Sequence, residues 1–166
     1  PLLLLLFLIT GIAAALLWRE HQSSLRRQLI LANKTTVAEL QVDVKNHANA
    51  LATIIRTLAV DPRLQEALAA GDFDRLRSDW LPVYDSLHKE HNLTHFYFVD
   101  PGRICRLRLH KPEKHGDLID RFTLLKAERT GTTASGLEVG PLGLVTLRVV
   151  RPVFRESQFV GFIELG

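Results

Sequence analysis

Apolar and polar residues follow three different patterns along this 166-residue chain. Residues 1–18 contain no charged side chain, and residues 19–60 place apolar side chains three and four positions apart. From residue 95 onward, several short runs alternate with a period of two. The first two patterns are typical of helices and the third of strands. The sequence therefore predicts an apolar helix, a long amphipathic helix and a sheet-forming domain.

Residues 1–18 form a candidate membrane anchor. As a helix they would span about 27 Å, close to the thickness of a bilayer core. Trp18 and Arg19 follow, where interfacial side chains anchor a helix end. A cleaved signal peptide is the alternative, but the alanines at 13–15 lead into further apolar residues, and the run exceeds a usual signal core. We therefore expect an uncleaved anchor in a lipid bilayer.

The next segment, residues 19–60, contains no proline and predicts one long helix next to the membrane. Its seam steps alternately by three and four, which is typical of a dimerising coiled coil. The alternative is a helix that packs on its own domain. The seam positions are Val37, Leu40, Val44, His47, Leu51, Ile54 and Leu58.

About 145 residues follow the anchor, which is enough for one domain with its own core. We place this domain at residues 61–166, after the long helix. Short helices are expected at 62–70, 73–90 and 122–129, and strands at 95–100, 104–110, 133–139, 144–150 and 159–165. A turn is expected at 140–143. Alternation within the second strand places Cys105, Leu107 and Leu109 in the core and Arg106, Arg108 and His110 on the other face. The expected fold is α+β, with a five-stranded antiparallel sheet.

Charge and composition narrow the partners. Residues 1–92 hold ten Lys and Arg against ten Asp and Glu, whereas residues 93–166 hold eleven against eight. The excess of positive charge in residues 93–166 is scattered rather than clustered, which argues against nucleic acid as a binding partner. The single Cys105 permits no internal disulfide and no covalently attached haem. We expect no cofactor.

Three histidines, His88, His91 and His95, have a spacing that could suggest zinc. Residues 92–94 interrupt the helix before His95, and no carboxylate completes a familiar ligand pattern. We therefore expect structural roles for these histidines and no metal. A membrane-anchored zinc enzyme remains a minor alternative.

The second half of the chain resembles a known family. The segments FVDPGR (98–103), LRLHKP (107–112), HGDLIDRFT (115–123), ASGLE (134–138), LRVVRPV (147–153) and GFIELG (161–166) are similar to those of double Cache domains. These are PAS-like extracytoplasmic sensory modules of bacterial histidine kinases, diguanylate cyclases and chemoreceptors. The resemblance covers roughly residues 25–166. It implies a module in the bacterial inner membrane that continues into a second membrane helix and a cytoplasmic output domain.

The cationic face of the second strand suits an anion, since Arg108 offers a planar fork for a carboxylate and His110 adds a donor. The resemblance implies a ligand between the sheet and its covering loops, where further side chains would contribute. The expected ligand-binding residues are Arg108, His110, Arg148, Tyr97, Arg121 and Thr123. The alternative is that Arg148 and Arg151 pair with Glu138 or Asp120, and that Arg106 is solvated.

No catalytic constellation is visible, so we expect a sensor rather than an enzyme. The sensor would bind a small organic anion and signal through its transmembrane helix as a homodimer. The alternative function is a structural dimerisation or spacer module whose Cache pocket is closed by internal salt bridges.

Overall fold

The computed structural model describes residues 2–140 and 143–166, without the side chains of residues 2–6, 8 and 29. It divides into two compact units, Pro1–Asp43 and Val44–Gly166. The first unit belongs to the long helix α1 (Leu2–Ala59), which continues into the second. In the part of the chain that is described, no helix is long and apolar enough to cross a membrane. The anchor predicted over residues 1–18 is not confirmed, and it lies partly outside the described residues.

Two short helices follow α1 where the sequence predicts them. Helix α2 (Pro62–Ala70) begins after Asp61, whose side chain accepts a hydrogen bond from the Arg63 backbone N–H. It ends at Gly71, which has a φ of 68°, a conformation that costs glycine little. Helix α3 (Phe73–His91) comes next. The side chain of Asp72 accepts the Arg75 backbone N–H and caps α3 in the same way, so both helices begin at local capping signals.

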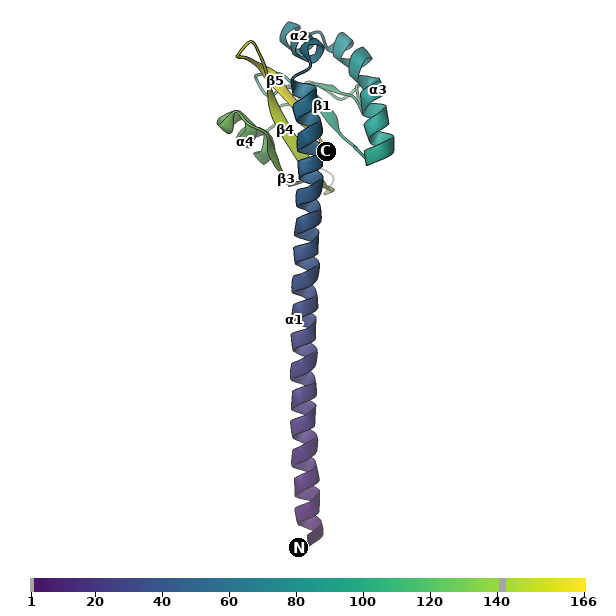
Figure 1. Cartoon of the computed structure of the whole chain (residues 1–166), viewed down its shortest axis with the longest axis vertical. Helices are drawn as coiled ribbons and strands as arrows, with labels where there is room; N and C mark the ends of the chain where they lie inside the picture. Colours follow the sequence, from purple (N-terminus) through teal and green to yellow (C-terminus); the bar gives the residue numbers. More distant parts are fainter. Residues whose placement is uncertain (1, 141–142) are drawn as a thin grey trace. The chain divides into compact units, whose positions relative to one another are not determined.

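The five strands form one antiparallel sheet in the order β2-β1-β5-β4-β3 (Figure 1). Their bounds are β1 Phe96–Val99, β2 Cys105–Arg108, β3 Ala134–Val139, β4 Val145–Arg155 and β5 Gln158–Leu165. Helix α4 (Phe122–Thr130) lies between β2 and β3 in the sequence. The expected α+β fold with a five-stranded antiparallel sheet is confirmed. The turn predicted at 140–143 includes residues 141 and 142, which lie outside the described residues.

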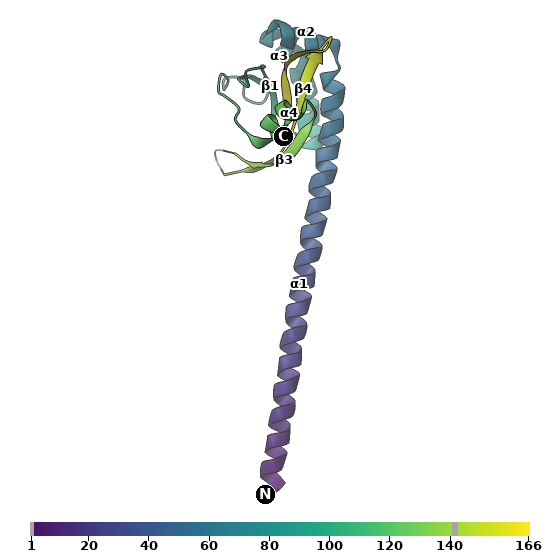
Figure 2. The same ribbon diagram turned by 90° about the vertical axis from the view of Figure 1, so that its left-hand side faces the viewer.

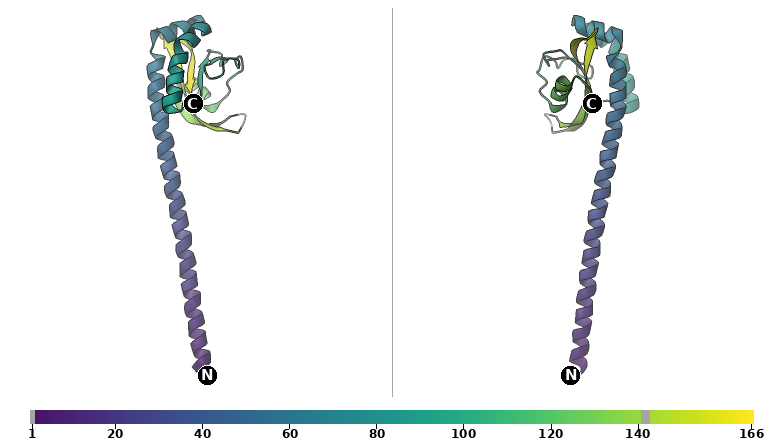
Figure 3. Two further views of the ribbon diagram at one scale, coloured as in Figure 1. Left: turned by 90° about the vertical axis from the view of Figure 1, so that its right-hand side faces the viewer. Right: turned by 60° about the vertical axis from the view of Figure 1, so that its left-hand side comes forward.

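Helices cover the sheet on both faces (Figure 3). One face packs against the end of α1 together with α2 and α3, and the largest core lies there, around Ile55, Leu64, Trp80, Phe96 and Phe98. The other face carries a smaller core with residues from α4. In Figure 2, α4 is drawn in front of the strands on the side of this second face. We call it the α4 face.

Strand β4 continues five residues beyond its predicted end at residue 150 and includes Pro152. Its pairing with β3 ends at Val150, so beyond that point β4 pairs with β5 alone. Proline is tolerated there because the missing N–H has no partner strand to reach. The predicted end of this strand at Val150 was wrong. The sequence does not show that β3 stops there, which leaves β4 at the edge of the sheet and able to continue through a proline.

Strand β2 departs from simple alternation. Tyr97 pairs with Arg108 and Phe98 with Leu107, but Val99 pairs with Cys105, which leaves one extra residue in β2. Cys105 therefore lies on the α4 face, in the core that includes Val99, and not beside Leu107 as alternation predicted. Such a bulge reverses the side of every residue beyond it.

The bulge also separates the two arginines of β2. Arg106 is exposed and its Nε lies 2.7 Å from Asp100 Oδ2, at the β1–β2 turn. Arg108 is buried on the α4 face, 4% exposed. The cationic face that we expected from Arg106 and Arg108 together is thus reduced to Arg108 alone on this strand.

Part of the apolar seam predicted along α1 packs against the core of its own domain. Val37 and Leu40 are 53% and 61% exposed. In contrast, Leu51 and Ile54 pack against the large core, and Leu58 is part of it. The sequence left open whether this helix packs on its own domain, and near its end it does. Dimerisation through the remaining seam stays a prediction.

Candidate functional site

The register of the sheet aligns a row of polar residues on the α4 face. Tyr97 of β1 lies opposite Arg108 of β2 on one side and Glu164 of β5 on the other. Arg148 of β4 reaches the same place and ion-pairs with Glu164. Arg121 approaches from the start of α4 and also contacts Glu164. Residues from four strands and one helix therefore meet around Tyr97.

The Tyr97 ring lies at the centre of this group. The guanidinium carbons of Arg108, Arg121 and Arg148 lie 4.7, 5.5 and 5.8 Å from its centroid. The ring of His110 stacks on Tyr97 with centroids 5.3 Å apart. The face of an aromatic ring attracts cations, so Tyr97 stabilises the positive charges of these three arginines, which lie close to one another. We call these residues, with their acidic partners below, the Tyr97 cluster.

Each arginine of the cluster has an acidic partner. Arg108 forms two parallel hydrogen bonds to Asp117, with Nη1–Oδ1 at 2.7 Å and Nη2–Oδ2 at 2.8 Å. These bonds hold the pKa of Asp117 below its usual value. Asp117 lies in the loop between β2 and α4, and its side chain is 47% exposed. The pair therefore ties a covering loop to the sheet.

Glu164 is the acidic residue at the centre of the cluster and is fully buried. Its carboxylate accepts hydrogen bonds from Arg148 and from Nη2 of Arg121, the latter at 2.8 Å. Glu138 of β3 lies beside it, and its Oε1 accepts the backbone N–H of Thr123 at 2.7 Å. This bond places a carboxylate at the N-terminus of α4, where the helix dipole favours negative charge.

Several buried polar atoms of the cluster have no hydrogen-bond partner among the described residues. The Nε atoms of Arg121 and Arg148 lie 3.5 and 3.6 Å from Glu138 Oε2, too far for good hydrogen bonds. Nδ1 of His110 and Oγ1 of Thr123 also have none. Buried unpaired polar atoms are costly, and water, an ion or a ligand commonly satisfies them.

His95 and His110 lie side by side, with ring centroids 4.7 Å apart. Burial, together with the positive charge of nearby arginines, chiefly Arg148 for His95 and Arg108 for His110, lowers the pKa of each to about 4. Both rings are therefore neutral at pH 7. A neutral His110 offers one donor and one acceptor rather than a positive charge.

All six residues predicted for the ligand site are buried or half-buried on the α4 face. Tyr97, Arg108, His110, Arg121 and Arg148 contact one another around the ring, and Thr123 joins them through Glu138. Sequence reasoning named Glu138 as an alternative partner of Arg148, and Arg148 Nε does lie 3.6 Å from Glu138 Oε2. It did not assign His95, Asp117 or Glu164 to this site. The signal for Glu164 was available, because a lone carboxylate in the apolar strand GFIEL requires a buried partner.

The three histidines considered for zinc have separate surroundings. His88 Nδ1 lies 2.7 Å from the backbone oxygen of Leu93, and its ring stacks on Tyr84 at 5.7 Å. His91 is exposed at the end of α3. His95 contacts Tyr97 in the cluster described above.

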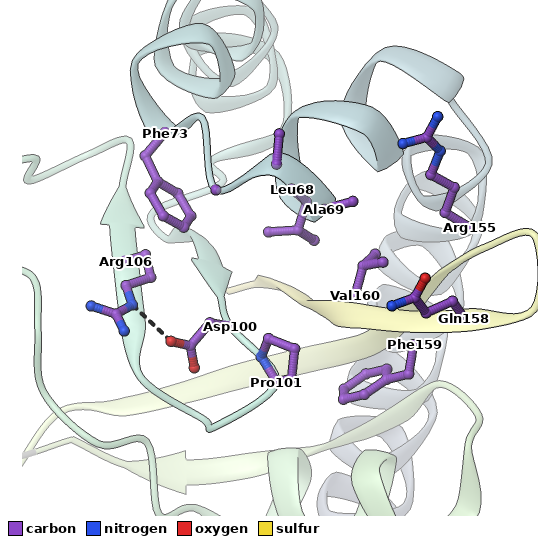
Figure 4. A pocket seen from close by; sticks show the side chains of 12 residues that line it. Leu68, Ala69, Phe73, Asp100, Pro101, Arg106, Arg155, Gln158, Phe159 and Val160 are labelled. Carbon is purple, nitrogen blue, oxygen red and sulfur yellow. Dashed lines mark hydrogen bonds and ion pairs between the residues drawn. The ribbon is translucent and has the colours of Figure 1, made fainter.

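An open cavity of about 640 Å³ lies away from the Tyr97 cluster, between α2, the β1–β2 turn and β5 (Figure 4). Phe73 and Phe159 provide apolar walls, and the Arg106–Asp100 pair lies at its edge. Nothing in the sequence indicated this cavity, because its walls come from three segments that are distant along the chain. The Tyr97 cluster does not line it.

A five-stranded antiparallel sheet with a helix and loops over one face has a PAS-like architecture. The chain belongs to the double Cache family, whose model, described as "Double sensory domain of two-component sensor kinase", matches residues 14–166. The resemblance noted in the sequence is thereby confirmed. This family is sensory rather than catalytic. No curated protein matches the chain.

Solved structures support the same fold. The Escherichia coli DcuS sensor domain superimposes with a TM-score of 0.58 at 20% identity, covering 74% of this chain and 89% of that one. The Vibrio cholerae histidine kinase DctB sensor domain gives 0.59 at 14% identity, covering 74% and 51%. The Campylobacter jejuni chemoreceptor Tlp3 domain, in complex with 4-methylisoleucine, gives 0.52 at 14%, covering 79% and 52%. This chain thus spans about half of the latter two domains.

Proposed function

We propose that this chain is the extracytoplasmic ligand-sensing module of a bacterial membrane receptor. It binds a small organic anion, a carboxylate, at the Tyr97 cluster and signals along α1 to a cytoplasmic output domain. The observation that carries the proposal is the concentration of three arginines and several unpaired buried polar atoms around one tyrosine. Family membership and the amino acid bound by the Tlp3 domain agree with it.

A carboxylate would bind by exchange rather than by simple addition. Arg108 already holds Asp117, and that partner is half-exposed at the mouth of the cluster. A ligand carboxylate can take the same planar fork while Asp117 moves into water, where its charge is solvated at low cost. Arg121 Nε, Arg148 Nε and Thr123 Oγ1 belong to the same cluster and have no hydrogen-bond partner among the described residues, so a ligand that extends to them gains further hydrogen bonds. Displacement of Asp117 would release the loop that it holds, which links binding to a conformational change.

The proposal is tested by thermal unfolding of the chain in mild detergent, with a panel of mono- and dicarboxylates and amino acids. A ligand at about 100 times its dissociation constant stabilises the native state by about 2.7 kcal/mol. For a domain of this size that corresponds to a rise in melting temperature of about 5 to 10 °C. Arg108→Ala should abolish most of this rise.

Arg106→Ala is the matched control, because it removes an arginine two positions away on the same strand that lies outside the cluster. It should leave the ligand response intact. If Arg108→Ala responds to the ligand as the wild type does, the Tyr97 cluster is not the binding site.

The second candidate is a structural spacer module, and one observation favours it. The arginines of the cluster all have carboxylate partners, so their charges are compensated within the domain. Under this alternative no member of the panel shifts the melting temperature. Arg108→Ala would then lower the stability of the free domain instead of its ligand response.

A further inference from the structure

Opposite the Tyr97 cluster, on the other face of the sheet, lies a pocket of about 390 Å³. Arg151 of β4 pairs in register with Ile163, a residue of the large core, which places it on the face that α1 covers. The pocket thus lies between α1 and the sheet. Its polar lining residues are Asn49, Thr53, Arg56, Thr132, Thr133 and Arg151.

The hydrogen bonds of the two arginines leave donors available. Arg56 uses Nε for the Ala52 carbonyl and Nη2 for the Thr53 hydroxyl. Arg151 uses Nη1 for the hydroxyl oxygen of Thr133, at 2.7 Å, and its Nε is buried without a partner among the described residues. Because Thr133 accepts this bond, its own O–H is free to donate.

The charges of this pocket are not compensated as those of the Tyr97 cluster are. None of its lining residues is acidic, and the described structure records no ion pair to Arg56 or Arg151. Burial lowers the pKa of Arg151, and the positive charge of Arg56 lowers it further. Arg56 is exposed and Arg151 is half-buried, so the two guanidinium groups repel each other across an open polar pocket, an arrangement that a bound anion would relieve.

We propose that Arg56 and Arg151, with Thr133 as an additional donor, form a second binding site, for a small oxyanion of the sulfate or phosphate type. Each guanidinium group is planar and presents two parallel N–H donors, which match two oxygens of such an anion. The site is separate from the Tyr97 cluster and does not depend on the function proposed for it. Its donors come from α1 and from the sheet, so the bound anion joins the helix to the sheet.

The test titrates the chain with sodium sulfate against sodium chloride at equal ionic strength. The variants Arg56→Gln and Arg151→Gln remove the site, and Arg129→Gln, at an exposed position on α4, removes the same charge elsewhere. At tenfold excess over its dissociation constant, sulfate should raise the melting temperature by about 5 °C beyond chloride. Arg129→Gln should keep this rise, and both other variants should lose it.

Hydrogen exchange locates the effect. Sulfate should slow exchange at the amides of residues 49–56 and 132–133 in the wild type and in Arg108→Ala, but not in Arg151→Gln. Sodium phosphate and sodium acetate repeat the titration and separate a tetrahedral oxyanion from a carboxylate. Sulfate also stabilises proteins by exclusion from their surface. An equal rise in all variants would identify that general effect and overturn the proposal, as would loss of the response in Arg108→Ala.

Discussion

Glu164 is the residue whose replacement tests the Tyr97 cluster most directly. It is fully buried and contacts both Arg121 and Arg148. In the cluster, three arginines face the carboxylates of Asp117, Glu138 and Glu164, so the formal charges sum to zero. Glu164→Gln keeps the shape of the side chain and leaves one positive charge in excess.

The magnitude follows from the burial of the pair. Removal of one partner of a buried ion pair costs about 3–5 kcal/mol, because the other charge stays buried without compensation. The amide oxygen of the new glutamine still accepts one hydrogen bond, so we expect about 3 kcal/mol for Glu164→Gln. At roughly 4 °C per kcal/mol, the melting temperature should fall by about 12 °C.

Urea unfolding, followed by circular dichroism, measures this loss. Glu156→Gln in the exposed β4–β5 turn is the control and should change stability by less than about 0.5 kcal/mol. A loss below about 1 kcal/mol would refute the view that Glu164 balances the arginines.

Three further predictions concern other parts of the chain. Gly161→Ala should cost about 3 kcal/mol or more, because its Cβ would lie 2.4 Å from a backbone oxygen of β1 and its φ is 141°; a urea midpoint close to the wild type would contradict the close approach. The pKa values of His95 and His110, about 4 in the native state, lie below the unfolded value of 6.5, so their contribution to stability is complete above pH 6.5 and is lost as the pH falls toward 4. The slope in unfolding free energy should approach about 2.7 kcal/mol per pH unit near pH 5, and a urea midpoint that is constant from pH 7 to 4.5 would exclude this linkage. Finally, Leu40→Asp should abolish a dimer through the exposed seam whereas Gln41→Asp should not, and sedimentation that gives the same mass for both variants would argue against that seam.

The elements of this domain were largely determined by local sequence. Asp61 followed by proline begins α2, and Gly71 ends it, because capping depends on the residues next to the helix terminus. Alternation likewise identified all five strands, and the motifs of the second half identified the family. Arg108 and Arg148 were assigned to one site because they lie in those motifs and on strands.

Other features depend on residues that meet only in the folded sheet. The bulge in β2 moved Cys105 to the α4 face, and the short overlap of β4 with β3 allowed Pro152 within a strand. The pairing of Arg121 with Glu164 joins residues 43 positions apart. Sequence patterns report the periodicity of a single segment, whereas register and ion pairing are properties of two segments brought together. For this reason the sequence alone named the arginines of the cluster and Glu138 as one alternative partner, and only the tertiary structure revealed Asp117 and Glu164 beside them.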